Sequence, residues 1–231
     1  MHPHDSARLP LVVALTGASG SVYGVRLLDV LSRLGHRVEL LISPAAAQVA
    51  NQELGLVWNL DDFRLESLWR TPEGRAWWEV LGEPFAKPDG ASVVGETSPD
   101  DKIEYFHYQD YLAPAASGSH RTAGMVICPC SSGTLSALVH GAASNLIVRA
   151  AEVHLKERRR LLLVPRETPL SLPLARNLVA ATEAGAVVLP ASPGWYHRPR
   201  RLHDLVDFVV GRVLDQLGID HQLVRRWGES R

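Results

Sequence analysis

The chain has 231 residues, of which 46% are hydrophobic and 21% are charged. A chain of this size and composition can bury a hydrophobic core, which excludes a disordered or fibrous protein. The formal net charge of -1 provides no basic field, so we do not expect a nucleic-acid partner. The apolar runs are much shorter than the roughly 20 residues of a membrane helix, and the N-terminus lacks a secretory signal pattern. We therefore expect a cytoplasmic protein with no membrane partner.

Metal and disulfide sites are not predicted. The only two cysteines, Cys128 and Cys130, are separated by one proline. This spacing is poor for a mutual disulfide, and two thiols are too few for a structural zinc site. Single histidines such as His140, His154 and His197 lack metal-ligand spacing. We predict reduced thiols in the core and no metal.

Short apolar runs alternate with helical patterns along the chain. Five predicted strands cover residues 11–15, 38–42, 125–128, 161–164 and 186–189. Predicted helices cover residues 22–34, 131–140, 145–159, 175–184 and 202–217, and a further helix begins at Ser43-Pro44, a favoured N-cap followed by a favoured first residue. Fully apolar strands between helices indicate an α/β fold with an open, doubly wound parallel sheet of Rossmann or flavodoxin type. This arrangement has three layers.

Residues 57–118 differ in character from the rest of the chain. They are rich in proline, glycine and acidic residues and carry four of the six tryptophans: Trp58, Trp69, Trp77 and Trp78. We interpret this stretch as an insertion within one domain covering residues 1–231. It is predicted to contain a helix at 60–68 and an edge strand at 102–108. The tryptophans predict packing, with another subunit as a candidate partner.

Two small-residue turns follow predicted strands. Residues 16–20, Thr-Gly-Ala-Ser-Gly, join the first strand to the first helix, and Ser131-Ser132-Gly133-Thr134 begin the helix after the strand at 125–128. Helix N-termini bind anions, and the carboxyl ends of parallel strands meet at one sheet edge. The pair of turns therefore predicts a phosphate or flavin site. Steric turn formation and simple N-capping are the alternatives for each turn taken separately.

Several charged residues also point to an anion. Arg149 and Lys156 lie seven residues apart on one helix face, and Glu152 can pair with Lys156. A solvated charged face is the alternative. Arg166-Glu167 follow a strand, where α/β proteins collect their sites. Arg212 lies within the apolar pattern of the last helix and requires a partner or an anionic ligand, unless it sits at the margin of the stripe.

Together these segments resemble the flavin prenyltransferase family, the UbiX-like proteins among the flavin-binding cysteine-decarboxylase-like flavoproteins. The resemblance runs through most of the chain and rests on the order and spacing of its motifs. These are LTGASGSVYGVRLLDVL, ISPAA, MVICPCSSGTLSALVHG, NLIVRAAEVHLKERR, LLLVPRETPL, GAVVLPASPGWYHRP and LVDFVVGRVLDQLGI. Residues 57–118 match no motif of the family and look longer than is usual.

The resemblance implies transfer of a dimethylallyl group from dimethylallyl phosphate to N5 and C6 of reduced FMN, without a metal. The product, prenylated FMN, would pass to a UbiD-like decarboxylase. Residues implied to contact FMN are Gly17, Ala18, Ser19, Ser43, Ser131, Ser132, Gly133, Thr134 and Arg166. Those implied to bind the prenyl phosphate are Arg149, Lys156, Tyr196 and Arg212, and those implied in catalysis are Ser19, Glu53, Lys156 and Glu167. Such proteins look like dodecamers, so the groups are expected to converge from neighbouring subunits.

The chemistry of these residues fits that reaction. An allylic phosphate leaves as an anion, which cations and the Tyr196 hydroxyl can stabilise as the bond breaks. The allyl cation is stabilised by flavin and aromatic faces. Glu167, helped by Ser19, is the candidate for removing the proton, and the departing phosphate is an alternative base. The alternative functions are a phosphopantothenoylcysteine decarboxylase-like FMN enzyme, whose substrate motif and catalytic histidine are not recognisable, and a non-catalytic FMN-binding accessory subunit.

Overall fold

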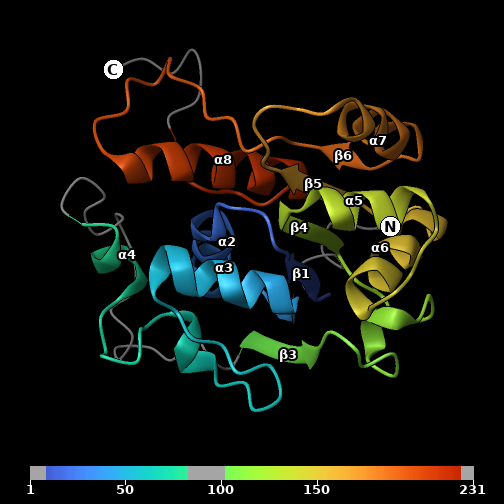
Figure 1. Cartoon of the computed structure of the whole chain (residues 1–231), viewed down its shortest axis with the longest axis horizontal. Coiled ribbons are helices and arrows are strands. Elements are labelled where there is room, and N and C mark those ends of the chain that lie inside the picture. The colour runs from blue at the N-terminus through green and yellow to red at the C-terminus, as the bar shows by residue number, and fades with distance from the viewer. Residues whose placement is uncertain (1–8, 83–101, 225–231) are drawn as a thin grey trace.

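Six parallel strands form one sheet in the order β3-β2-β1-β4-β5-β6. The computed structural model describes residues 9–82 and 102–224. The strands are β1 (Leu11–Leu15), β2 (Val38–Ile42), β3 (Ile103–His107), β4 (Gly124–Cys130), β5 (Leu161–Pro165) and β6 (Val187–Val188). In Figure 1 the sheet is seen from β6 in the upper part to β3 in the lower part. This order is that of the Rossmann type, and it confirms the predicted open parallel sheet.

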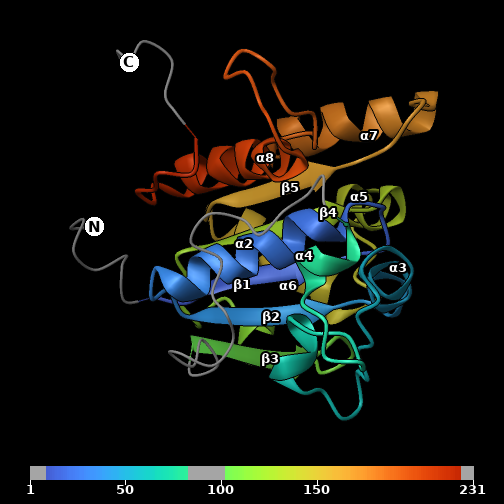
Figure 2. The same ribbon diagram turned by 90° about the vertical axis from the view of Figure 1, so that its left-hand side faces the viewer.

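Helices cover both faces of the sheet. They are α2 (Ser21–Arg33), α3 (Pro44–Leu54), α4 (Trp77–Val80), α5 (Ser132–Val139), α6 (Leu146–Lys156), α7 (Leu172–Glu183) and α8 (Leu202–Leu217). One core lies between the sheet and α2, α3 and α8, and a second core lies between the sheet and α5, α6 and α7. Figure 2 shows the strands between these helices. Because every residue of β1 is buried, each of its faces contributes to one core.

The predicted helix starts are confirmed where a serine follows a strand. The Ser43 hydroxyl accepts a hydrogen bond from Ala46 N, and Pro44 is the first residue of α3. The Ser131 hydroxyl accepts one from Thr134 N at the start of α5. These bonds satisfy amide groups that have no partner within the helix. Both capped helix starts lie at the carboxyl ends of strands.

The middle of the chain differs from its prediction. The edge strand is confirmed as β3, which pairs with β2. The helix expected at 60–68 is wrong, because only a short 3-10 helix, η1 (Leu65–Leu68), forms there. The Asn59 side chain accepts hydrogen bonds from Asp61 N and Asp62 N, and this local turn competes with a helix start. Part of the predicted insertion, residues 83–101, lies outside the described residues.

The tryptophans of this region belong to the core of the chain itself. Trp58, Trp69 and Trp77 are buried against the sheet face covered by α2, α3 and α8, and Trp78 packs beside them. The suggestion that they form a subunit contact is therefore wrong for the three buried rings. Both halves of the chain contribute strands to one sheet, which favours the one-domain interpretation.

The structure also tests the predictions for the cysteines and for membrane-spanning segments. The predicted core thiols are confirmed, since Cys128 and Cys130 are buried and form no disulfide. Burial raises the pKa of both, so neither is a thiolate at neutral pH. Among the described helices, none has the length and apolar character needed to cross a membrane.

Candidate flavin and prenyl phosphate site

The turn after β1 and the turn after β4 are joined by one buried hydroxyl. Thr16 Oγ1 donates a hydrogen bond to Pro129 O at 2.7 Å and accepts one from Ser131 N at 2.8 Å. The strand order reverses between these two strands, which is where doubly wound proteins bind their ligands. The two small-residue turns predicted to form a site therefore lie side by side.

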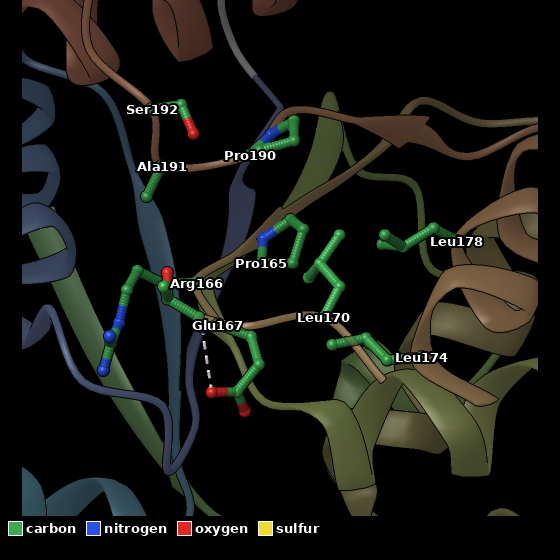
Figure 3. Close-up of a pocket in the computed structure, with 10 residues that line it drawn as sticks. Pro165, Arg166, Glu167, Leu170, Leu174, Leu178, Pro190, Ala191 and Ser192 are labelled. Carbon is green, nitrogen blue, oxygen red and sulfur yellow. Dashed lines mark hydrogen bonds between the residues drawn. The ribbon is translucent and has the colours of Figure 1, made fainter. Parts of the chain in front are cut away.

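Arg166 ties the turn after β5 to the same place. Its Nε donates a hydrogen bond to Ser19 O at 3.1 Å. Figure 3 shows its side chain pointing away from the leucines around the neighbouring cavity. The predicted contacts Gly17, Ala18, Ser19, Ser131 and Arg166 thus belong to three adjoining loops. Ser43 joins them from the next strand, because Ser43 N donates to Leu15 O at 3.0 Å.

The arrangement fits an anionic cofactor such as FMN. Ser132 and Gly133 are exposed in the first turn of α5, and a Cβ atom at Gly133 would meet nothing within 4 Å. The amide groups of this turn can therefore reach a phosphate. On the other side, a Cβ atom at Gly17 would lie 2.4 Å from Ala45 Cβ. Only glycine lets the turn approach α3 this closely.

Glu53 lies at the start of α2, where the sequence predicts an external anion. Its carboxylate accepts hydrogen bonds from Gly20 N at 3.0 Å, Ser21 N at 2.8 Å and the Ser21 hydroxyl at 2.5 Å, at the start of α2. Burial alone would raise the pKa of Glu53, but hydrogen bonds from Ser19, Ser21 and Gly20 outweigh it and lower the pKa. The helix start is thus already neutralised by a carboxylate of the chain.

A cavity of about 270 Å³ opens beside Glu167. It lies between the ends of β5 and β6 and helix α7, and Figure 3 shows Leu170, Leu174 and Leu178 on one side of it. The Glu167 carboxylate accepts a hydrogen bond from Thr168 N at 3.1 Å and is otherwise exposed. A carboxylate at the rim of an apolar cavity is well placed to meet a substrate with an apolar group.

Arg149 and Lys156 both lie on α6. Arg149 Nε donates to Ala116 O at 3.2 Å, and its guanidinium lies 3.9 Å from Glu152. Lys156 forms an ion pair with Glu157, so the predicted pairing of Glu152 with Lys156 is wrong. Both cations are partly exposed, and each keeps donors available for an anion.

Tyr196 and Arg212 lie near α8, on the opposite face of the sheet. The Tyr196 ring meets the Phe208 ring edge-on, with centroids 5.6 Å apart. Arg212 is half-exposed and pairs with Asp215 at 2.8 Å. It also lines a cavity of about 260 Å³ together with Phe208. Since α6 and α8 belong to different cores, one chain does not bring its four predicted phosphate-binding residues together.

Sequence reasoning missed the side chains that join these loops. Thr16 lies in the expected turn, but its partners are more than a hundred residues away and leave no local pattern. Tyr23, half-buried in the first turn of α2, was also missed. Burial and the nearby Cys128 raise its pKa, and Arg166 opposes this effect, so the phenol lies close to the site loops.

Among the described residues, no cluster of three or more His, Cys, Asp or Glu side chains could hold a metal ion. The cations and hydroxyls at the sheet edge are instead suited to phosphate. Fold and site together define a flavoprotein, and the family model described as flavoprotein matches residues 1–214.

The chain is similar to named relatives along nearly its full length. It is 43% identical over 219 residues to the flavin prenyltransferase UbiX of Halalkalibacterium halodurans, covering 95% of this chain and 93% of that one. It also matches the crystal structure of AnUbiX (PadA1) in complex with FMN and dimethylallyl pyrophosphate. The identity there is 33% with a TM-score of 0.75, over 97% of this chain and 100% of that one.

A second solved structure is a dodecameric FMN-dependent UbiX-like decarboxylase from Escherichia coli O157:H7. It is 33% identical with a TM-score of 0.73, over 96% of this chain and 100% of that one. The chain belongs to the flavoprotein family and, within it, to the flavin prenyltransferases of the UbiX type.

Proposed function

We propose that this protein transfers a dimethylallyl group from dimethylallyl phosphate to N5 and C6 of reduced FMN. The observation that carries the proposal is that groups suited to binding phosphate form two separate sets. One set lies in the joined loops after β1, β4 and β5, and the other consists of the cations on α6 and α8. A protein that only carried FMN would have no use for the second set.

The residues that would hold FMN are those of the joined loops. Gly17, Ala18 and Ser19 would contact it from the β1 turn and Ser43 from the start of α3. Ser131, Ser132, Gly133 and Thr134 would contribute from the start of α5, and Arg166 from the end of β5. Reduced FMN supplies an electron-rich acceptor for the allylic carbon. The exposed first turn of α5 offers amide donors, and the Ser19 hydroxyl lies next to the carbonyl that Arg166 holds.

Arg149, Lys156, Tyr196 and Arg212 would bind the phosphate as it departs. Each supplies positive charge or a hydroxyl donor, and the leaving phosphate gains negative charge as the carbon–oxygen bond breaks. Donors that bind it more strongly at that point lower the barrier. Guanidinium groups suit phosphate oxygens because they offer paired donors in a fixed plane.

Glu167 is our candidate for proton removal, with Ser19 assisting. Its carboxylate is exposed at the rim of the apolar cavity and accepts only one hydrogen bond that the structure records. Glu53 is bound by three donor groups at the α2 start, which favours an orienting and electrostatic contribution from this predicted catalytic residue.

We further propose that complete sites form between copies of the chain. The phosphate-binding residues lie on opposite faces of one sheet, and a solved relative is a dodecamer. A neighbouring copy can bring α6 of one chain to α8 of another. The product would be used by a UbiD-like decarboxylase, and the expected location is the cytoplasm.

Release of phosphate tests the proposed reaction. The protein is incubated with dimethylallyl phosphate and either reduced FMN, oxidised FMN or no flavin, and inorganic phosphate is measured. Of the three samples, we expect only the one with reduced FMN to release phosphate, because transfer requires the acceptor. The decarboxylase alternative predicts no phosphate release and instead carbon dioxide from phosphopantothenoylcysteine. An accessory subunit would produce neither.

A further inference from the structure

Residues 114–122 lie along α6 and are held to it by arginines; we call them the α6 strap. Arg149 Nε donates to Ala116 O at 3.2 Å. Farther along, Arg159 donates to Gly118 O and to His120 O, each at 2.5 Å. The strap therefore follows the helix from the residue proposed to bind phosphate to the turn beyond its end.

The strap also passes directly over Lys156. A Cβ atom at Gly118 would lie 2.6 Å from Lys156 Nζ and 2.3 Å from Glu157 Oε1. The strap backbone thus limits where the ammonium group can lie. The strap thus accepts a hydrogen bond from Arg149 and borders the ammonium group of Lys156, which pairs with Glu157.

The far end of the strap is anchored to the sheet by a part-buried contact between a histidine and a carboxyl group. His120 Nε2 lies 2.6 Å from Glu39 Oε1, and Glu39 is only 5% exposed within β2. The other charged neighbours are Glu104, the register partner of Glu39 on β3, and Arg37. Glu39 Oε2 is buried and has no hydrogen-bond partner among the described residues. His120 is therefore the main compensation for this carboxyl group, and its loss would leave the group unpaired.

A second anchor lies next to the first. Thr122 Oγ1 is 2.7 Å from His154 Nε2, and His154 Nδ1 is 2.7 Å from Ala150 O within α6. A neutral imidazole with its proton on Nδ1 satisfies both contacts. The strap is thus fixed to the sheet through Glu39, to α6 through His154, and to the turn after α6 through Arg159.

We propose that His120 and Glu39 are positioning residues, which hold the strap so that Arg149 and Lys156 are oriented for the phosphate of the prenyl donor. The inference rests on the proposed function of the two cations. Arg149 uses its Nε for the hydrogen bond to the strap. Its terminal nitrogens, one of which lies 3.9 Å from Glu152, are thereby directed toward a ligand. Releasing the strap would return rotamer freedom to both long side chains, and donor binding would then have to restrict it again.

The test compares KM and kcat in strap variants of the assembled protein. We expect His120→Ala to raise KM for dimethylallyl phosphate roughly tenfold, with a smaller change in kcat. FMN affinity should be unchanged, because His120 lies before the start of β4, whereas the flavin loops follow the carboxyl ends of the strands. His120→Gln, which keeps a donor near Glu39, should restore most of the binding. Glu104→Gln, the matched control, removes a carboxylate beside Glu39 without touching the strap and should leave KM unchanged.

Glu39→Gln is measured in the same assay and decides the result if His120→Ala does not assemble. Unchanged KM in assembled His120→Ala or Glu39→Gln would overturn the inference, as would equal effects of His120→Ala and His120→Gln. Arg149→Met separates this outcome from a failure of the proposed function. If Arg149→Met leaves KM unaltered, the proposed role of Arg149 in phosphate binding is wrong. If it raises KM while the strap variants do not, only the positioning role is wrong.

Discussion

Glu53 and Glu167 are carboxylates at the same edge of the sheet, but their surroundings differ. Glu53 is surrounded by donors from Gly20, Ser21 and Ser19, which lower its pKa against the opposing effect of burial. Glu167 accepts a hydrogen bond from Thr168 N and faces solvent and a cavity. A base must be free to take a proton, so Glu167 is better placed for that role.

Glu167→Gln tests this difference. We expect near-normal FMN affinity, since Arg166 and the glycine turns remain, and a transfer rate lowered on the order of a hundredfold or more. Flavin binding is measured by fluorescence titration and transfer in a single turnover. If the variant loses flavin binding instead, Glu167 has a structural role.

His154 should make stability depend on pH. Burial lowers the pKa of this histidine from 6.5 to about 4, against the hydrogen bond to Ala150. As pH falls from 6.5 towards 4, His154 is therefore protonated in the unfolded chain but remains neutral in the folded chain. Stability is fully present above this window and declines within it, by about 3 kcal/mol at the low end.

This decline is measured by denaturant unfolding across the window at fixed protein concentration. His154→Gln, which cannot titrate, should lose less stability over the same range, whatever its stability at neutral pH. If the free energy of unfolding depends on pH in the same way in both proteins, His154 does not cause the decline.

At the scale of elements, the strands and helices with a clear apolar period could be predicted from the sequence. Helix α8 agrees with its predicted bounds, as do β1 and β2, because burial and periodicity act locally there. The structure of residues 60–68 could not be predicted, because a turn formed by the Asn59 side chain overrides a weak helical pattern. The buried tryptophans looked like a contact surface because composition does not reveal which side of a segment faces the core.

The candidate site was predictable to a similar extent. The loops that follow strands could be predicted because parallel strands end at one edge of the sheet. The residues proposed to contact FMN therefore lie close together. The strap could not be found, because its contacts join residues far apart in the chain, such as Glu39 with His120. Residue type alone says nothing of such pairs.

The close approach of the β1 turn to α3 gives a prediction for these elements. Gly17→Ala would place its Cβ atom 2.4 Å from Ala45 Cβ and push the turn away from the start of α3. We expect FMN affinity to fall on the order of tenfold, the equivalent of about 1.4 kcal/mol. The double variant Gly17→Ala with Ala45→Gly restores the space and should recover binding. Failure of this recovery would mean that the turn is not limited by α3.

At the scale of the whole molecule, the sheet separates the two cationic halves. Arg149 and Lys156 lie on the sheet face that α6 covers. Tyr196 and Arg212 lie near α8, on the opposite face of the sheet. The near-zero net charge of the chain is thus an average over separate local patches. Assembly of copies would unite the halves without any movement within a chain.

Mixing two inactive variants tests this assembly. Arg149→Ala damages one half and Arg212→Ala the other, and each is expected to be nearly inactive alone. When the two are dissociated and reassembled together, some sites receive two intact halves and activity should reappear. A mixture of two copies of the same variant is the control. No recovery in the mixed assembly would mean that both halves serve the same chain.

The mass of the flavin after reaction tests the central claim most directly. The purified protein is mixed with reduced FMN and dimethylallyl phosphate under anaerobic conditions, and the released flavin is analysed by mass spectrometry. We predict a flavin heavier than FMN by one dimethylallyl unit, formed only when protein and donor are both present. Recovery of unmodified FMN from protein that binds both ligands would contradict the account.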